Sequence, residues 1–175
     1  PDPMIALCQN GYWEEIQRKI ERSKDASKAI APEALPTCIN RSLCDNQLSL
    51  FRYLVTLTKN GAQHIKRTCI NEAIKRGNVK TLQFALEHGL DVSKTYKEDS
   101  VLHMASRSKK RTVQLISFLL KQNQKHLDEA REVLLKLDQR SLISGATPLG
   151  EALKQQSYDA AQMLLNAGAS LLEAI

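Results

Sequence analysis

A four-residue motif that occurs twice constrains the fold of this chain more than any other feature. The sequence Thr-Cys-Ile-Asn stands at residues 37–40 and again at residues 68–71, so the two copies begin 31 residues apart. Two similar segments follow, Ser-Val-Leu-His at residues 100–103 and Thr-Pro-Leu-Gly at residues 147–150. A unit that recurs every thirty-odd residues is typical of a solenoid, in which each repeat buries its apolar face only against its neighbours.

Each of the four segments is predicted to begin a helix. A serine or threonine stands where an N-cap belongs, and Pro148 occupies the first helical position, where its missing N–H needs no partner. The residues that follow also keep a common spacing, because 13 residues separate Ala73 from Leu86 and again Ala152 from Leu165. We therefore expect each repeat to form a pair of helices.

The repeats resemble the ankyrin repeat, whose units run Thr-Pro-Leu-His-x-Ala-Ala, a glycine turn, an apolar Leu-Leu helix, and Gly-Ala before a β-turn finger. Residues 147–149 and 167–169 carry the likeness most clearly, and the pairs at residues 77–78 and 102–103 support it. The resemblance implies an all-α fold, an α-solenoid of about four to five helix-turn-helix repeats in one domain over residues 1–175. We expect these repeats at residues 4–36, 37–67, 68–99, 100–143 and 144–175.

The fourth repeat contains roughly a dozen more residues than one repeat needs. Within this excess, four apolar residues recur at helical spacing with charged residues between them, namely Leu127, Ala130, Leu134 and Leu137. Such a pattern is typical of an amphipathic helix. We therefore predict an extra helix at residues 123–139 that interrupts the array.

The charge and hydropathy of the chain limit its partners and its compartment. Lys and Arg number 25 against 19 Asp and Glu, and this net charge of +6 favours acidic partners. The sequence has no apolar run long enough to span a membrane and no secretory signal at its start. We expect a cytoplasmic monomer. The divergent repeats also resemble, in style, the ankyrin-containing effectors that intracellular bacteria deliver, which would place the chain in the host-cell cytoplasm.

The four cysteines are Cys8, Cys38, Cys44 and Cys69. They form no Cys-x-x-Cys motif, and their density is far below that of a small secreted domain. We interpret them as free, buried thiols of a protein in a reducing compartment. The alternative is a disulfide or metal pair, and stacked repeats would bring Cys38 close to Cys69.

No motif in the sequence indicates catalysis. The chain lacks a glycine-rich phosphate loop, a paired-carboxylate motif and a zinc-binding spacing, and its four histidines are scattered. At the position of His103, the resemblance implies a ring that hydrogen-bonds the backbone of the adjacent finger. Asn40 and Asn71 are expected to do the same with an amide. We predict a protein that is not an enzyme and that uses no cofactor, metal or small-molecule substrate.

The resemblance also implies a binding surface on the finger turns and on the first helix of each repeat. In this chain the surface is basic with apolar tips, and its predicted partner-binding residues are Ile65, Arg67, Lys75, Arg76, Tyr96, Lys97, Asp99, Arg107, Ile143 and Lys154. Such a surface suits a protein or peptide that carries acidic residues around apolar anchors.

Three other interpretations of these residues stay open. The charges can be ordinary solvated helix faces, or they can bind nucleic acid or anionic lipid electrostatically. Interspersed acidic residues and the lack of aromatic residues at stacking spacing argue against nucleic acid. The chain can also be the targeting part of a larger enzyme, such as an effector.

Overall fold

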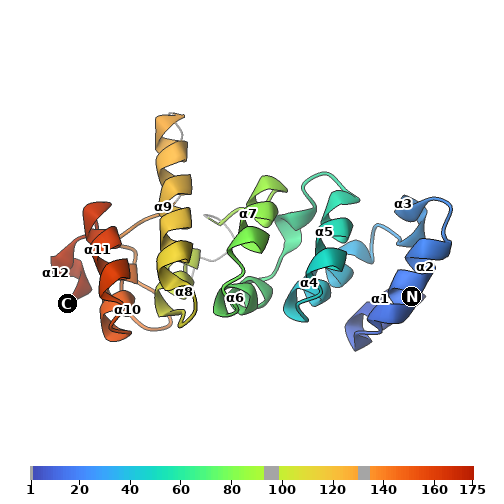
Figure 1. The fold of residues 1–175 in the computed structure, drawn as a ribbon, viewed down its shortest axis with the longest axis horizontal. Coiled ribbons are helices and arrows are strands. Elements are labelled where there is room, and N and C mark those ends of the chain that lie inside the picture. Colours follow the sequence, from blue (N-terminus) through green and yellow to red (C-terminus); the bar gives the residue numbers. More distant parts are fainter. Residues whose placement is uncertain (1, 93–98, 130–134) are drawn as a thin grey trace. The chain divides into compact units, whose positions relative to one another are not determined.

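A computed structural model describes residues 2–92, 99–129 and 135–175, and the regular structure within these ranges is all helical (Figure 1). None of the helices described there is long and apolar enough to cross a membrane. The backbone groups into two compact units. Unit 1 comprises Pro1–Ala73 and Lys80–Leu90, and unit 2 comprises Ile74–Val79 and Asp91–Ile175. The sequence predicts a single domain over residues 1–175.

Unit 1 is built from short helices packed around aromatic and branched side chains. It contains α1 (Pro3–Asn10), α2 (Trp13–Arg22), α3 (Ala26–Ala29), α4 (Leu35–Cys44), α5 (Leu48–Thr56), the 3-10 helix η1 (Gly61–His64), and most of α6 (Arg67–Lys75) and α7 (Val79–Glu87). Helix α4 is central, because it contacts α1, α5 and η1. Phe51 is fully buried, and its ring meets that of Phe84 edge-on, with 6.4 Å between the ring centroids.

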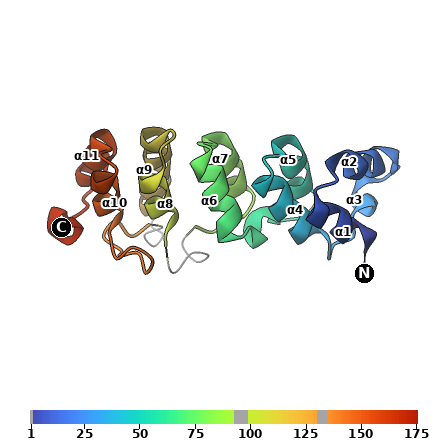
Figure 2. The same ribbon diagram turned by 90° about the horizontal axis from the view of Figure 1, so that it is seen from below.

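Unit 2 has two layers of helices. Its elements are α8 (Val101–Arg107), α9 (Thr112–Asp128), α10 (Pro148–Lys154), α11 (Tyr158–Asn166) and α12 (Leu171–Ala174). Helices α8 and α10 lie side by side in one layer, and α9 and α11 lie side by side in the other (Figure 2). Leu102, Leu115, Ile116, Leu149 and Leu164 are fully buried in this unit. Their burial removes apolar surface from water and holds the layers together.

The predicted helix starts are confirmed in unit 2 and wrong in unit 1. The Ser100 hydroxyl accepts the His103 N–H at 3.3 Å, and the Thr147 hydroxyl accepts the Gly150 N–H at 3.1 Å. Thr37 is not an N-cap, because α4 begins at Leu35. Its first turn already contains Pro36, which lacks an N–H that would need a partner. Thr68 likewise lies inside α6, which begins at Arg67.

The extra helix predicted at residues 123–139 does not form as a separate element in the described residues. Helix α9 continues to Asp128 instead, because no glycine or proline interrupts residues 121–128. Residues 130–134 lie outside the described residues, and residues 135–139 are not helical. Asn123 helps to fix the returning chain, since its buried Oδ1 accepts the Leu135 N–H at 3.0 Å.

The prediction of free thiols is wrong, because the structure has two disulfides, Cys8–Cys38 and Cys44–Cys69. Their Cα atoms are 5.1 Å and 4.7 Å apart, within the range that a disulfide spans. Each bond joins the last turns of one helix to the first turns of another. Cys38 and Cys69 therefore do not pair with each other, because each faces a cysteine near the end of the helix before it.

Candidate functional site

A polar hollow of about 600 Å³ lies along α4 in unit 1. It is lined by side chains of α1, α4, η1 and α6 together with the residues between η1 and α6, namely Gln9, Pro36, Thr37, Asn40, Arg41, Cys44, His64, Lys66, Thr68 and Cys69. We call it the α4 hollow. The Thr-Cys-Ile-Asn motif of residues 37–40 forms part of its wall.

Helix α4 supplies one continuous face to this hollow. Thr37, Asn40, Arg41 and Cys44 follow the i, i+3, i+4, i+7 spacing that places side chains on one side of a helix. The other side of α4 packs into the core, where Ile39 and Leu43, among others, are buried. The apolar positions therefore fix how the helix rotates, and this rotation turns the polar face toward the hollow.

Asn40 positions the opposite wall of the hollow. Its Nδ2 donates to the Pro36 carbonyl at 2.8 Å and to the His64 carbonyl at 3.0 Å, while its Oδ1 accepts the Lys66 N–H at 2.6 Å. The expected contact between Asn40 and the backbone of the following connection is confirmed. This bridge fixes the backbone from which the side chains of His64 and Lys66 extend.

The electrostatics of the α4 hollow favour a negatively charged ligand. Arg41 and Lys66 are the cations of its lining, and no lining residue carries a carboxylate. Arg41 is held in place by Asp45, whose Oδ2 accepts from Arg41 Nε at 2.9 Å and from Trp13 Nε1 at 3.2 Å. Lys66 is exposed and forms no ion pair with any described residue. Because Asp45 already pairs with Arg41, Lys66 supplies the uncompensated positive charge of the lining, and a carboxylate can bind against it.

Three of the predicted partner-binding residues have structural roles instead. Ile65 is only 1% exposed, so it is not an apolar tip on the surface. Asp99 is only 2% exposed and is paired with Arg107. Arg107 also reaches Glu151, with 3.3 Å between Nη1 and Oε1. Sequence order could not show these contacts, because Glu151 lies in another repeat.

The other predicted residues divide between the units. Ile143 is 58% exposed, and Lys75 and Lys154 are also exposed, all three in unit 2. Arg67 of unit 1 and Arg76 of unit 2 are half-buried. Tyr96 and Lys97 lie outside the described residues. The sequence prediction did not include Arg41, His64 or Lys66, although each lies within two residues of a Thr-Cys-Ile-Asn motif or within the connection before one.

Unit 2 contains a buried polar network around Arg107. The guanidinium bonds both Asp99 and Glu151, and Glu151 also accepts from the Ser144 hydroxyl. Both carboxylates are almost fully buried, and Asp99 Oδ1 has no hydrogen-bond partner among the described residues. A single cation thus compensates two buried acidic groups. Such an arrangement fixes the local structure around Arg107, 28% of whose side chain stays exposed.

His103 joins two helices of unit 2 through its ring, as expected from its position in the motif. Its Nε2 lies 3.0 Å from the Ala146 carbonyl, and its Nδ1 lies 2.7 Å from the Ser100 hydroxyl. The carbonyl can only accept, so the proton is assigned to Nε2. Burial lowers the pKa of His103, and the Asp99 carboxylate, whose Oδ1 is 3.9 Å from Nδ1, opposes this shift.

The lowered pKa of His103 predicts a loss of stability in mild acid. A histidine in the unfolded chain has a pKa of about 6.5, so as the pH falls the unfolded chain binds this proton before folded His103 does. The free energy of unfolding should therefore fall by about 1 kcal/mol between pH 7.5 and pH 5.5. Urea unfolding at the two pH values measures this change. The variant His103→Gln, whose amide can donate to Ala146, should lose most of this dependence. An unchanged dependence in that variant would contradict the prediction.

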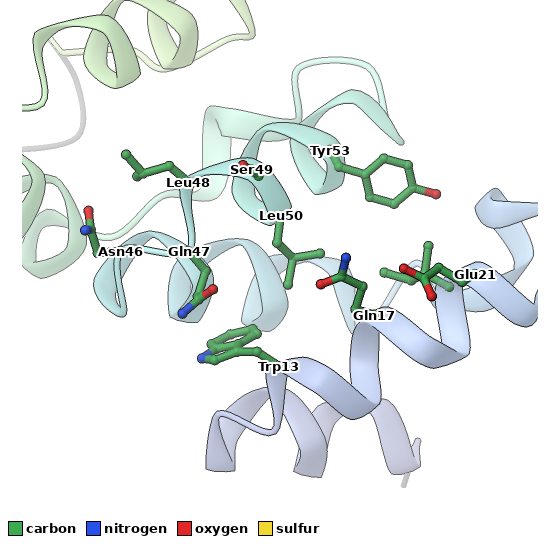
Figure 3. A pocket seen from close by; sticks show the side chains of 10 residues that line it. Trp13, Gln17, Glu21, Asn46, Gln47, Leu48, Ser49, Leu50 and Tyr53 are labelled. Carbon is green, nitrogen blue, oxygen red and sulfur yellow. The ribbon is translucent and has the colours of Figure 1, made fainter.

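A second hollow of about 500 Å³ lies between α2 and α5 in unit 1. Figure 3 shows that Gln17 of α2 and Leu50 of α5 point toward one another across it, above the indole ring of Trp13. The buried hydroxyl of Tyr53, which also lines this hollow, has no hydrogen-bond partner among the described residues. Its lining mixes apolar side chains and amides with one carboxylate, that of Glu21, and contains no cation.

Within the described residues, no group of three or more His, Cys, Asp or Glu side chains is arranged to hold a metal ion. No family model matches the chain, and no curated protein is similar to it.

Proposed function

We propose that the chain is a non-catalytic interaction module of ankyrin-like repeats that binds an acidic protein or peptide segment at the α4 hollow. The observation that carries the proposal is the charge of the lining, which has Arg41 and Lys66 and no carboxylate. Because Asn40 and Asp45 hold the backbone of Lys66 and the Arg41 side chain, little conformational freedom is lost on binding.

The contacts between helices support the ankyrin-like assignment. The helices pack against one another within the pairs α4–α5, α8–α9 and α10–α11, and the first helix of each pair contains residues of one of the recurring motifs. Asn40 and His103 occupy the same motif position, and each hydrogen-bonds the backbone of a later connection. A stack of such pairs is the expected arrangement of a solenoid.

The double variant Arg41→Glu and Lys66→Glu should weaken binding of an acidic ligand by at least about tenfold, a change of about 1.4 kcal/mol. The probe is a fluorescent peptide that carries several glutamates around two leucines, and its binding is followed by anisotropy. The lining charges would then repel the peptide, while both side chains lie at the surface and leave the core intact.

The matched control is Lys109→Glu with Lys110→Glu, which reverses the same number of exposed charges in unit 2. It should leave the affinity within about twofold. Equal affinity of the wild type and the Arg41/Lys66 variant would refute the proposed site. Tighter binding of duplex DNA or anionic vesicles than of the peptide, with a steep salt dependence, would favour the electrostatic alternative.

A further inference from the structure

The two disulfides of unit 1 differ in their access to solvent. Cys8 and Cys38 are both 0% exposed. Cys44 is half-buried, and Cys44 and Cys69 both line the α4 hollow. Each bond joins a cysteine near the end of one helix to a cysteine near the start of another. We call the fully buried Cys8–Cys38 bond the sealed disulfide and the Cys44–Cys69 bond the open disulfide. Exchange with an external thiol requires access to a sulfur, which only the open disulfide provides.

The two sulfurs of the open disulfide are not equivalent. Cys44 is the last residue of α4 and is the more exposed, whereas Cys69 is 4% exposed and is the third residue of α6. The N–H groups and positive end of a helix stabilise a thiolate in its first turn. An attacking thiolate therefore reaches Cys44, and Cys69 is the better leaving group.

The surroundings of this disulfide select the charge of the attacking thiol. Arg41 and Lys66 line the same hollow, and the lining itself has no carboxylate. Asp45 pairs with Arg41 from outside the lining, so Lys66 supplies the charge that attracts an anion. A volume of about 600 Å³ is large enough for a short peptide or an amino-acid derivative. A small thiol with carboxylate groups, of the type of glutathione, fits both the size and the charge.

We propose that Cys44–Cys69 is a thiol-exchange site for an anionic low-molecular-weight thiol. The thiolate of this co-reactant attacks Cys44 Sγ, a new S–S bond forms between them, and the Cys44–Cys69 bond breaks with its electron pair on Cys69. A second thiolate then attacks the external sulfur and releases Cys44 as a thiolate, which takes up a proton. The protein disulfide gains two electrons, and two molecules of the small thiol are oxidised to their disulfide.

The proposal concerns the reactivity of the chain itself, so it does not rest on the proposed function. Its structural consequence is local. Reduction removes the covalent link between α4 and α6, while the hydrogen bonds of Asn40 and the Cys8–Cys38 bond still hold α4.

The first experiment treats the native protein with reduced glutathione, stops the reaction with N-ethylmaleimide and maps the labelled cysteines by mass spectrometry. We expect Cys44 and Cys69 to become labelled at least about tenfold faster than Cys8 and Cys38, because the sealed bond reacts only after local opening. In guanidinium the two disulfides should react at similar rates. The proposal is overturned by equal rates in the native protein, by faster labelling of Cys8 and Cys38, or by labelling of all four cysteines without a reductant.

The second experiment tests the charge of the ligand. Lys66→Met should slow the reaction with glutathione about threefold at low salt, and it should slow 2-mercaptoethanol less, because the thiolate of that reagent carries no carboxylate charge. Lys109→Met, which removes an exposed lysine outside the hollow, is the matched control and should alter neither rate. If Lys66→Met slows both thiols equally, or slows neither, then the hollow does not select an anionic thiol.

Discussion

Replacing Arg107 with methionine should lower the free energy of unfolding by about 3 kcal/mol, because it leaves two buried carboxylates without a cation. Asp99 is 2% exposed and Glu151 is 3% exposed, and both bond this guanidinium. We expect the low end of the range for broken buried ion pairs, because 28% of the Arg107 side chain is exposed. Urea unfolding at pH 7.5, followed by helical circular dichroism, measures the change.

Two further variants separate charge from packing at this site. Lys154→Met removes an exposed cation of the same unit and should change stability by no more than about 0.5 kcal/mol. Adding Asp99→Asn and Glu151→Gln to Arg107→Met removes the uncompensated charge and should recover more than half of the loss. A loss below about 1 kcal/mol for Arg107→Met would show that the network contributes little to stability.

Replacing Gly61 with alanine should destabilise the chain by about 3 kcal/mol through a steric clash. An added Cβ would lie 2.2 Å from the Val55 carbonyl oxygen and 2.9 Å from its carbon, which are backbone atoms. The segment cannot move away easily, since the Ala62 N–H bonds the His88 carbonyl at 3.1 Å and Asn40 holds His64. The measurement is again urea unfolding with both disulfides intact.

Gly145→Ala is the matched control for this prediction. Nothing lies within 4 Å of an added Cβ at Gly145, so only its positive φ of 71° opposes alanine. That backbone conformation should cost about 1 kcal/mol. If alanine is tolerated as well at position 61 as at position 145, the close approach between Gly61 and Val55 does not exist in solution.

The sequence predicted the helix starts correctly in unit 2 and incorrectly in unit 1. Ser100 and Thr147 begin their helices as predicted, because a hydroxyl caps an N–H only a few residues away. The start of α4 was missed by three residues, since Leu35, Pro36 and Thr37 are already helical. The continuation of α9 was also missed, because periodicity alone cannot tell a new helix from a longer one.

The candidate site was harder to predict, because it depends on contacts between residues that are distant in the sequence. The pairing of Arg107 with Glu151 spans 44 residues, and it turns a predicted partner contact into a structural group. The hydrogen bonds of Asn40 were predicted, since the motif position implied them. The sequence did not predict that these hydrogen bonds hold Lys66 beside a hollow, because sequence order does not show which side chains line the same space. Likewise, four cysteines allow several pairings, and spacing alone does not select one.

The two disulfides also determine which parts of unit 1 can be stretched. Both engage α4, one at Cys38 and the other at Cys44, and they close segments with sequence separations of 30 and 25 residues. A force that pulls on the two ends of the chain is transmitted through the disulfides, so the segments that they close do not extend. The extended length of the unfolded chain is thereby shorter by roughly 180 Å, and reduction of the disulfides would restore this length.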